Sequence, residues 1–392
     1  MDINGLLAAA RNAWALTPLG GGVEPAQATP SAVLYELPHA RVARVAPRDD
    51  QAGDPVLLVT PLAVPVSCWD LRPGQSLAAH LAGVAATSVG PGRPTYTIDY
   101  GPITFADRGM GFEDWVDQIL PTAIRRICEA HGGAPVHLVG WSHGGTMSLL
   151  TAAHDSALPV ASVTAIGTPT DYALNPAYAA VFGAHRLTGL RLTFTATALL
   201  GGTTAPFTRL GYRWLAPVRE LTKPWSLLRN LDDAEVLARI GAVDRFIGAM
   251  PGYPARFFHQ AIGRLVIGRE LAVGTVHLSE RVVVDMSELV APTLLIGSTD
   301  DILANAASVA AGVAAYRNAE VTFAGMAGLS HLGLVASPRA HQLTWPAIDK
   351  HLAAHDAPHP RRDRALVGTP GPDSCPGRPT ANVLSVNARV AE

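Results

Sequence analysis

The sequence has few cysteines, almost no lysine and no long apolar run. Its three cysteines, Cys68, Cys128 and Cys375, are too few and too scattered for a disulfide framework or a zinc site, which favours a reducing compartment. Lysine occurs only at Lys223 and Lys350, and the formal net charge of −2 offers no basic surface to nucleic acid. No stretch reaches the roughly 18 continuous apolar residues of a transmembrane helix. These absences predict a cytoplasmic protein that neither spans a membrane nor binds nucleic acid.

Apolar residues are plentiful by contrast, at 48% of 392 positions, and they allow a deep core. The ends of the chain differ from the rest. Residues 1–30 combine a short helical pattern with the run Gly20-Gly21-Gly22, which indicates a flexible leader. Residues 357–392 are rich in Pro, Arg and Gly, and this composition predicts disorder.

Between these ends, short apolar runs alternate with longer helical patterns. This alternation is typical of an α/β fold in which a mostly parallel sheet is flanked by helices. The predicted strands are Val33–Leu37, Arg41–Ala46, Pro55–Thr60, Thr95–Asp99, Val136–Gly140, Ser162–Gly167, Thr293–Gly297 and Glu320–Ala324. The predicted helices are Ser76–Gly83, Phe112–His131, Ser142–His154, Ala304–Tyr316 and Ala340–His355. The rhythm breaks at 173–285, a mainly helical stretch that we expect to be a cap inserted into a core formed by 31–172 and 286–356.

One motif carries nucleophilic chemistry. A buried strand ends in Gly140-Trp141-Ser142-His143-Gly144, a G-x-S-x-G pattern, and a helical pattern follows. At such a sharp strand-to-helix turn the serine is held in a strained backbone conformation, and side chains two residues to either side would collide. The pattern therefore predicts Ser142 as a nucleophile.

A serine nucleophile needs a base that is oriented by an acid, and in this arrangement the chain order is serine, acid, histidine. We expect the acid after the strand Thr293–Gly297, where Asp300 is the first choice and Asp301 the neighbouring alternative. We expect the base in the loop after the last strand, which contains His331. Asp171 is a weaker candidate for the acid, and the competing histidines His259 and His341 lie outside the expected loop.

The oxyanion of an acyl-transfer intermediate needs two backbone donors. The N–H of His143, directly after the nucleophile, is the expected first donor. The second is expected after the strand Pro55–Thr60, where Leu62, Ala63 and Val64 are candidates and Ala63 is favoured. The chain has no P-loop, no dinucleotide fingerprint after its first strand and no H-E-x-x-H motif, so we expect neither cofactor nor metal.

Several separated segments resemble the polyhydroxyalkanoate synthase family, which has the α/β-hydrolase fold. The similar segments are Trp69–Leu77 (D-L-x-P-x-x-S-L), Ile98–Pro102 (I-D-W-G), Gly111–Val116 (G-x-E-D-Y), Thr168–Tyr172 (T-P-x-D-F), Met250–Pro254, and the loops of Asp300 and His331. The resemblance covers about residues 30–335. It implies an acyl-transfer reaction through a covalent intermediate. The expectation that the chain can form a homodimer comes from this resemblance alone.

The chain departs from that family at the nucleophile, where the synthases carry cysteine and this sequence has Ser142. A serine forms an oxyester, which is more dependent on its base than a thioester-forming cysteine. We therefore expect hydrolysis of a hydrophobic acyl or hydroxyacyl ester or thioester, such as an acyl-CoA. The alternatives are polyester synthesis from hydroxyacyl-CoA and, in another class, a catalytically silent partner subunit.

Overall fold

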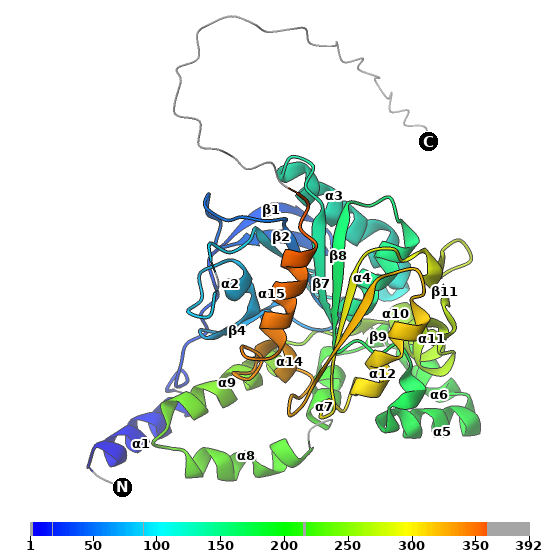
Figure 1. Cartoon of the computed structure of the whole chain (residues 1–392). Coiled ribbons are helices and arrows are strands. Elements are labelled where there is room, and N and C mark those ends of the chain that lie inside the picture. The colour runs from blue at the N-terminus through cyan, green and yellow to red at the C-terminus, as the bar shows by residue number, and fades with distance from the viewer. Residues whose placement is uncertain (1–2, 18, 89, 215–216, 359–392) are drawn as a thin grey trace, which may run out of the picture. The chain divides into compact units, whose positions relative to one another are not determined.

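A central eight-stranded sheet organises the chain (Figure 1). The computed structural model describes residues 3–17, 19–88, 90–214 and 217–358. The strands run in the order β1-β2-β6-β3-β7-β8-β13-β14, antiparallel from β1 to β6 and parallel from there on. Their bounds are β1 Ser31–Leu37, β2 Ala40–Val45, β3 Val56–Val59, β6 Thr95–Asp99, β7 Val136–Trp141, β8 Val160–Ile166, β13 Thr293–Ser298 and β14 Val321–Met326.

Helices cover both faces of this sheet. On one face lie α3 (Leu120–Ala130) and α4 (His143–His154), and on the other lie α2 (Leu77–Leu81) and α15 (Thr344–Ala354) (Figure 1). Within β3, Leu57 and Val59 belong to the first core, whereas Val56 and Leu58 belong to the second. Alternate side chains of a strand point to opposite faces, so a continuously apolar strand is buried on both.

The predicted fold class is confirmed, and each of the eight predicted strands is a strand of this sheet. Two predicted helices differ in detail. The helix expected over Phe112–His131 begins with a π-helical stretch, Asp114–Ile119, before α3. The helix expected over Ala304–Tyr316 is two short helices, α12 (Ala306–Ala310) and α13 (Gly312–Ala315).

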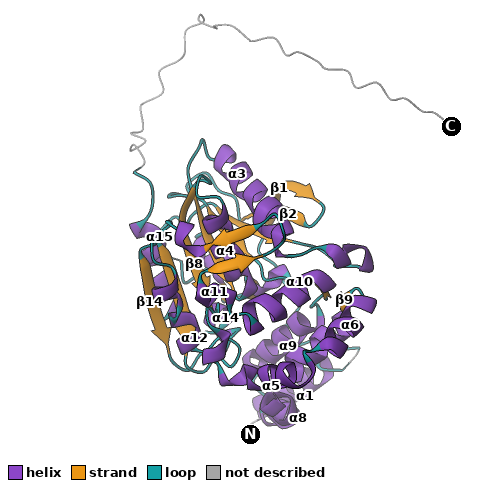
Figure 2. Cartoon of the chain, turned by 90° about the vertical axis from the view of Figure 1, so that its right-hand side faces the viewer, coloured by secondary structure: helices purple, strands orange, loops and turns teal. Residues whose placement is uncertain are grey.

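The segment 173–285, which we continue to propose as a cap, lies between β8 and β13. Figure 2 shows that its helices gather at one end of the sheet. The elements from here to β12 are α5 Ala179–Thr188, α6 Arg191–Leu199, β9 Gly202–Thr203, α7 Ala205–Trp214, α8 Pro217–Arg229, α9 Ala234–Gly248, β10 Tyr253–Pro254, α10 Ala255–Gln260, α11 Glu270–Val273, β11 Thr275–His277 and β12 Val283–Asp285. Among the described residues, no helix is both long enough and apolar enough to cross a bilayer.

The N-terminal segment, whose composition favours a flexible leader, is attached to the rest of the molecule. Its helix α1 (Ile3–Ala15) lies beside α9, and the Asn12 side chain donates to the carbonyl of Leu231 at 2.8 Å. Further along, the backbone N–H of Thr29 donates to Asp70 at 2.6 Å. The disorder predicted for 357–392 concerns a segment that, beyond residue 358, lies outside the described residues.

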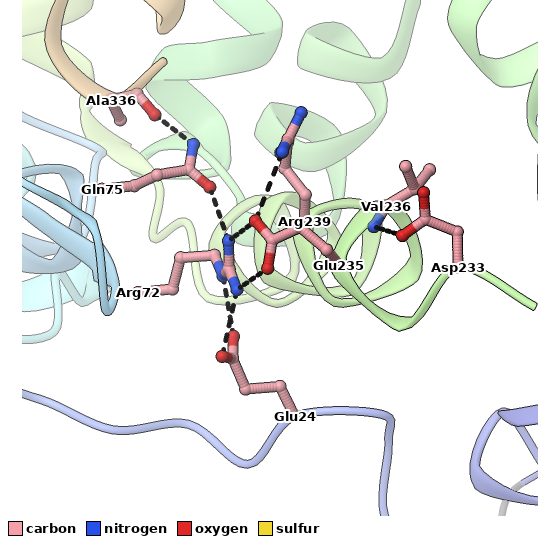
Figure 3. Close-up of polar contacts among 8 residues, drawn as sticks. All are labelled: Glu24, Arg72, Gln75, Asp233, Glu235, Val236, Arg239 and Ala336. Atoms are coloured by element: carbon pink, nitrogen blue, oxygen red, sulfur yellow. Dashed lines mark hydrogen bonds and ion pairs between the residues drawn. The ribbon is translucent and has the colours of Figure 1, made fainter. Parts of the chain in front are cut away.

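Arg72 joins three parts of the chain (Figure 3). It ends the short strand β4 (Asp70–Arg72), and its side chain is only 7% exposed. The guanidinium donates two hydrogen bonds to Glu24 of the leader, at 2.7 and 3.1 Å, and two to Glu235 of α9, at 2.6 and 2.8 Å. It also donates to Gln75 in β5 (Gln75–Ser76), whose amide in turn donates to the carbonyl of Ala336, the last residue of α14 (Gly333–Ala336). One buried cation therefore connects leader, core and cap.

We expect Arg72→Met to lower the free energy of unfolding by about 2–4 kcal/mol, because it leaves two carboxylates facing each other without their shared cation. Urea denaturation measures this change. Arg239→Met is the matched control. Its guanidinium bonds Glu235 at 3.2 Å as a helical i,i+4 pair and is 41% exposed, so about 0.5 kcal/mol is expected. Equal losses in the two variants would contradict a special role for Arg72.

A second ionic cluster lies at the amino ends of the central strands β3 and β7, opposite the carboxyl ends where α4 begins. Asp54, His137 and Asp356 place their ligand-type atoms within 4.8 Å of one another. The guanidinium of Arg93 donates to both oxygens of Asp356, at 2.5 and 2.7 Å, and the backbone N–H of Asp54 donates to the same carboxylate at 3.0 Å. The His137 ring lies 2.8 Å from the Ser162 hydroxyl. Because Arg93 supplies the compensating positive charge, this group fits an ion-pair network better than a cation site.

Burial lowers the pKa of six histidines, and this makes stability depend on pH. The six are His131, His137, His143, His259, His341 and His351. For His143 and His351 the pKa falls to about 4, because of burial first and then repulsion by neighbouring histidines. Between that value and the ordinary pKa near 6.5, the unfolded chain binds protons that the folded chain does not.

We therefore expect the free energy of unfolding to fall by roughly 2–4 kcal/mol between pH 7.5 and pH 5, since the penalty appears as pH drops below the unfolded pKa. Urea midpoints at the two pH values test this. His351→Gln should flatten the slope, because its neutral side chain cannot bind a proton. Identical wild-type midpoints at both values would contradict the expectation.

Candidate active site

Ser142 lies at the sharp turn between β7 and α4. Its backbone has φ 54° and ψ −125°, a conformation that non-glycine residues rarely adopt. Two hydrogen bonds hold it there: its N–H donates to the carbonyl of Ile166 at 2.8 Å, and its carbonyl accepts from the Thr168 hydroxyl at 3.0 Å. A strained serine held by the neighbouring strand β8 is the geometry that the motif predicts.

The flanking glycines are required by close backbone approach. A Cβ at Gly140 would collide with the carbonyl of Gly144, and a Cβ at Gly144 would collide with the carbonyl of Val59 at the end of β3. Residue 145 is also glycine, and a Cβ there would overlap the Thr168 hydroxyl. The turn therefore packs against the carboxyl ends of β3 and β8, the two strands that flank β7, and only glycine fits at these positions.

His331 is 9% exposed and follows β14 in the chain, as expected for the base. Its Nδ1 lies 2.7 Å from Oδ2 of Asp301, which is 1% exposed. Its Nε2 is buried and has no hydrogen-bond partner within the described part of the chain. Ser142 and His331 line the same cavity of about 200 Å³. Such a histidine has one nitrogen oriented by a carboxylate and the other available to a proton in the cavity.

The carboxylate that bonds His331 is that of Asp301. The first choice for this acid, Asp300, is therefore corrected to its neighbour. Asp300 is exposed, and its carboxylate accepts from the N–H of Gly328 at 2.6 Å and from the hydroxyl of Thr299 at 2.8 Å. Successive residues at the end of a strand point in different directions, so one of two adjacent aspartates faces the interior and the other faces solvent. The sequence spacing does not distinguish them.

The environment of Asp301 keeps it ionised. Burial alone raises the pKa of its carboxyl, but the nearby His331 and the N–H groups of Ala304 and Leu303, at 3.0 and 2.8 Å, more than offset this. The net pKa lies below the ordinary aspartate value. A permanent carboxylate at this place stabilises a protonated His331.

Sequence reasoning missed the residues that support this pair. The indole N–H of Trp141 donates to the carbonyl of His331 at 3.1 Å, and the two rings lie 4.9 Å apart. Gly167 lies behind the pair: a Cβ there would be 3.2 Å from the His331 ring and 3.3 Å from the Asp301 carboxylate. The sequence did contain Trp141 next to the nucleophile and a glycine directly after β8. Neither feature specifies which distant residue it contacts.

The competing candidates are engaged elsewhere. Asp171 forms a two-bond ion pair with Arg269, at 2.9 and 2.5 Å. His259 contacts the Thr197 hydroxyl at 2.8 Å within the cap. His341 stacks on Trp345, with ring centroids 4.0 Å apart. Among the described residues, none of the three hydrogen-bonds to Ser142 or His331 or lines the cavity that these two share, which favours His331 as the base.

The side chain of His143 contacts aromatic rings, with Phe112, Tyr253 and Phe257 each meeting it edge to face at centroid distances of 5.7–6.2 Å. With its pKa lowered to about 4, this imidazole is neutral at pH 7. Its backbone N–H at the start of α4 remains the predicted first oxyanion donor. The second stays a prediction too: Ala63 has φ 60°, but Leu62, Ala63 and Val64 line a different cavity of about 670 Å³, which shares Tyr253 with the cavity over Ser142.

Residues 78–328 match the family described as alpha/beta hydrolase fold. The chain belongs to the α/β hydrolase fold family. It is 25% identical over 336 residues to a poly(3-hydroxyalkanoate) polymerase subunit PhaC from Synechocystis sp., covering 83% of this chain and 84% of that one. It is 26% identical over 349 residues to the PhaC subunit of Allochromatium vinosum, covering 84% and 89% of the two chains.

Solved structures resemble it more distantly. A lipase-esterase related protein from Clostridium acetobutylicum has a TM-score of 0.48 at 12% identity, covering 80% of this chain and 99% of that one. The esterase RhEst1 from Rhodococcus sp. has a TM-score of 0.42 at 14% identity, covering 84% of this chain and 100% of that one. The family match and the similarity to polymerase subunits identify this α/β hydrolase-fold chain as an enzyme.

Proposed function

We propose that this enzyme transfers acyl groups through Ser142, His331 and Asp301, and that it hydrolyses hydrophobic acyl or hydroxyacyl esters or thioesters. The observation that carries the proposal is the His331 side chain. Its Nδ1 bonds the buried carboxylate of Asp301. Its Nε2 is buried and unpaired among the described residues, and the histidine lines the same cavity as Ser142. Strain at Ser142 supports the same assignment, because strained backbone is retained where function uses it.

The reaction would proceed in two halves. His331 Nε2 takes the proton from the Ser142 hydroxyl as Oγ attacks the carbonyl carbon, and the oxyanion is met by the His143 N–H and a second backbone donor. His331 then gives that proton to the departing alcohol or thiol, which leaves an acyl-serine. In the second half a water molecule loses a proton to His331 Nε2 and attacks the carbonyl carbon of the acyl-serine. His331 then returns that proton to Ser142 Oγ as the bond between the acyl carbon and Oγ breaks, which releases the acid and restores the Ser142 hydroxyl. Asp301 stays a carboxylate throughout.

The cavity supports a hydrophobic acyl group. Tyr172, Tyr178, Tyr212 and Tyr253 line it together with the nucleophile, as do apolar residues such as Ile262 and Val266. A small apolar cavity with few convergent polar groups suits an acyl chain whose carbonyl is the reacting end. A charged acyl group would lose its hydration there without gaining a partner.

A second candidate is polyester synthesis, in which a hydroxyl of another hydroxyacyl unit replaces water. The similarity over 83–84% of the chain to poly(3-hydroxyalkanoate) polymerase subunits favours it. The two reactions share the acyl-enzyme and differ in the acceptor that reaches it, which depends on how the cap excludes water. A third reading from another class, a catalytically silent partner subunit, requires that no acyl-enzyme forms.

Intact-protein mass spectrometry tests these alternatives. The protein is incubated with 3-hydroxybutyryl-CoA or with p-nitrophenyl butyrate, and peptide mapping locates any adduct. A single acyl adduct on Ser142 that clears to free acid is expected. An adduct that grows by repeated hydroxyacyl units would replace hydrolysis by polymerisation. No adduct with either substrate would overturn the enzyme assignment of Ser142 in favour of the silent subunit.

A further inference from the structure

A second cavity adjoins the one over Ser142. It has a volume of about 320 Å³, and His331, Leu303 and Tyr212 line both cavities. The small cavity lies on the Ser142 side of these three residues, and the second lies on the side of Trp141 and α9. These three residues therefore belong to the wall of the cavity over Ser142 and to the wall of a further, partly open cavity.

The walls of the second cavity are mostly apolar. They include Leu71, Val243, Phe246, Ile247 and Met250, of which Phe246, Ile247 and Met250 are buried. Arg239 is also in the wall, and its guanidinium already bonds the carboxylate of Glu235 at 3.2 Å. Such a surface matches a hydrocarbon chain and offers little to a phosphate-bearing leaving group.

The three wall residues are not equivalent. His331 is the proposed base, and the backbone N–H of Leu303 donates to Asp301 at 2.8 Å, so both belong to the acid–base pair and its support. Tyr212 comes from α7 in the cap, and it lines the cavity over Ser142 together with Tyr253. Tyr212 lines both cavities without belonging to the acid–base pair, so it can be changed without removing a group that proton transfer needs.

Resting on the proposed function above, we propose that the second cavity is a binding site for the distal part of a long acyl chain and that the Tyr212 ring controls access to it. The cavity over Ser142, at about 200 Å³, is smaller than the roughly 300–1,000 Å³ of a typical ligand pocket. With the Tyr212 ring in place, the enzyme accepts short acyl chains. When the ring is absent or has moved with α7, the chain continues past His331 into the space beneath α9.

The test compares p-nitrophenyl butyrate with p-nitrophenyl octanoate, which share a leaving group. In Tyr212→Ala, the ratio of kcat/KM for octanoate to that for butyrate should rise at least tenfold. The physical reason is that each methylene moved from water into an apolar site favours binding by roughly fourfold. Tyr212→Phe is the matched control, since it keeps the ring and removes only the hydroxyl. Its ratio should stay within about threefold of wild type.

A second substitution locates the chain. Val243 lines the second cavity but not the one over Ser142, so Val243→Trp fills that space. Added to Tyr212→Ala, it should return the ratio to the wild-type value. The proposal is overturned if Tyr212→Ala and Tyr212→Phe give the same ratio, or if Val243→Trp leaves the gain intact. It is also overturned if octyl butyrate, whose long chain is in the alcohol, gains as much as the octanoate ester.

A binding measurement separates this proposal from failure of the proposed hydrolysis. A dansylated fatty acid is titrated into Ser142→Ala and into Ser142→Ala/Tyr212→Ala, with thermal unfolding recorded for both. Tighter binding by the double variant, by at least tenfold, supports the chain site even if no ester is hydrolysed by the wild type. Equal affinity in two folded variants overturns it, whether or not hydrolysis occurs.

Discussion

Replacing Ser142 by alanine is expected to lower kcat for p-nitrophenyl butyrate by roughly 10⁴–10⁶, to a rate near that of the uncatalysed reaction. The substitution removes the oxygen that forms the acyl-enzyme, and no other serine and no threonine, cysteine or lysine is among the described lining residues. A small residual acceleration is expected, because the backbone oxyanion donors and the cavity remain. Release of p-nitrophenolate under saturating substrate measures the change.

The same substitution should leave stability equal or improved. Ser142 has a positive φ, and alanine carries the same strain, so the turn itself is unchanged. Ser142→Gly is the control for strain: it relaxes the backbone, should stabilise the fold and should be equally inactive. Activity in Ser142→Ala above a few per cent of wild type would exclude a serine acyl-enzyme.

The second large effect concerns the two adjacent aspartates. We expect Asp301→Asn to lower kcat by about 10⁴, because an amide in place of the carboxylate favours the wrong tautomer of His331 and cannot stabilise its protonated form. The loss should appear in kcat with little change in KM, since Asp301 does not line the cavity over Ser142.

Asp300→Asn is the internal control, one residue away. Its side chain is exposed and bonds Gly328 and Thr299, and an asparagine oxygen can accept the same hydrogen bonds. A change in kcat within about threefold is expected, as for most exposed substitutions. A large loss in Asp300→Asn together with a mild one in Asp301→Asn would reverse the assignment made from the structure.

The sheet could be predicted from the sequence because its signals are local. Runs such as Val56-Leu57-Leu58-Val59 are apolar on both faces, and that pattern by itself indicates a central strand of a parallel sheet. The turn at Ser142 was equally accessible, because the G-x-S-x-G pattern is contiguous and the close approach of Gly140 to Gly144 lies within it. The leader was different. Its attachment depends on Glu24 reaching Arg72, 48 positions away, and no local pattern encodes such a pairing.

The candidate site also combines features that the local sequence encodes with features that distant contacts decide. Ser142 and His331 could be placed from motif and chain order, whereas the choice between Asp300 and Asp301 depends on which way each residue points at the end of β13. That direction is set by burial against Gly167 and His331, which lie far away in sequence. The wall formed by Tyr212 was not predictable either, because it arises from a cap helix meeting a core loop.

The ion cluster around Asp356 affects when the chain can fold during synthesis. Asp356 bonds the N–H of Asp54 across 302 positions, and the same carboxylate meets His137 and Arg93 at the amino ends of the central strands. A contact of such sequence separation closes late. Asp356 follows α15, so the ribosome has already released all eight strands of the sheet when this carboxylate emerges. Until Asp356 emerges, Arg93 and His137 therefore lack the anion that they bond in the folded chain.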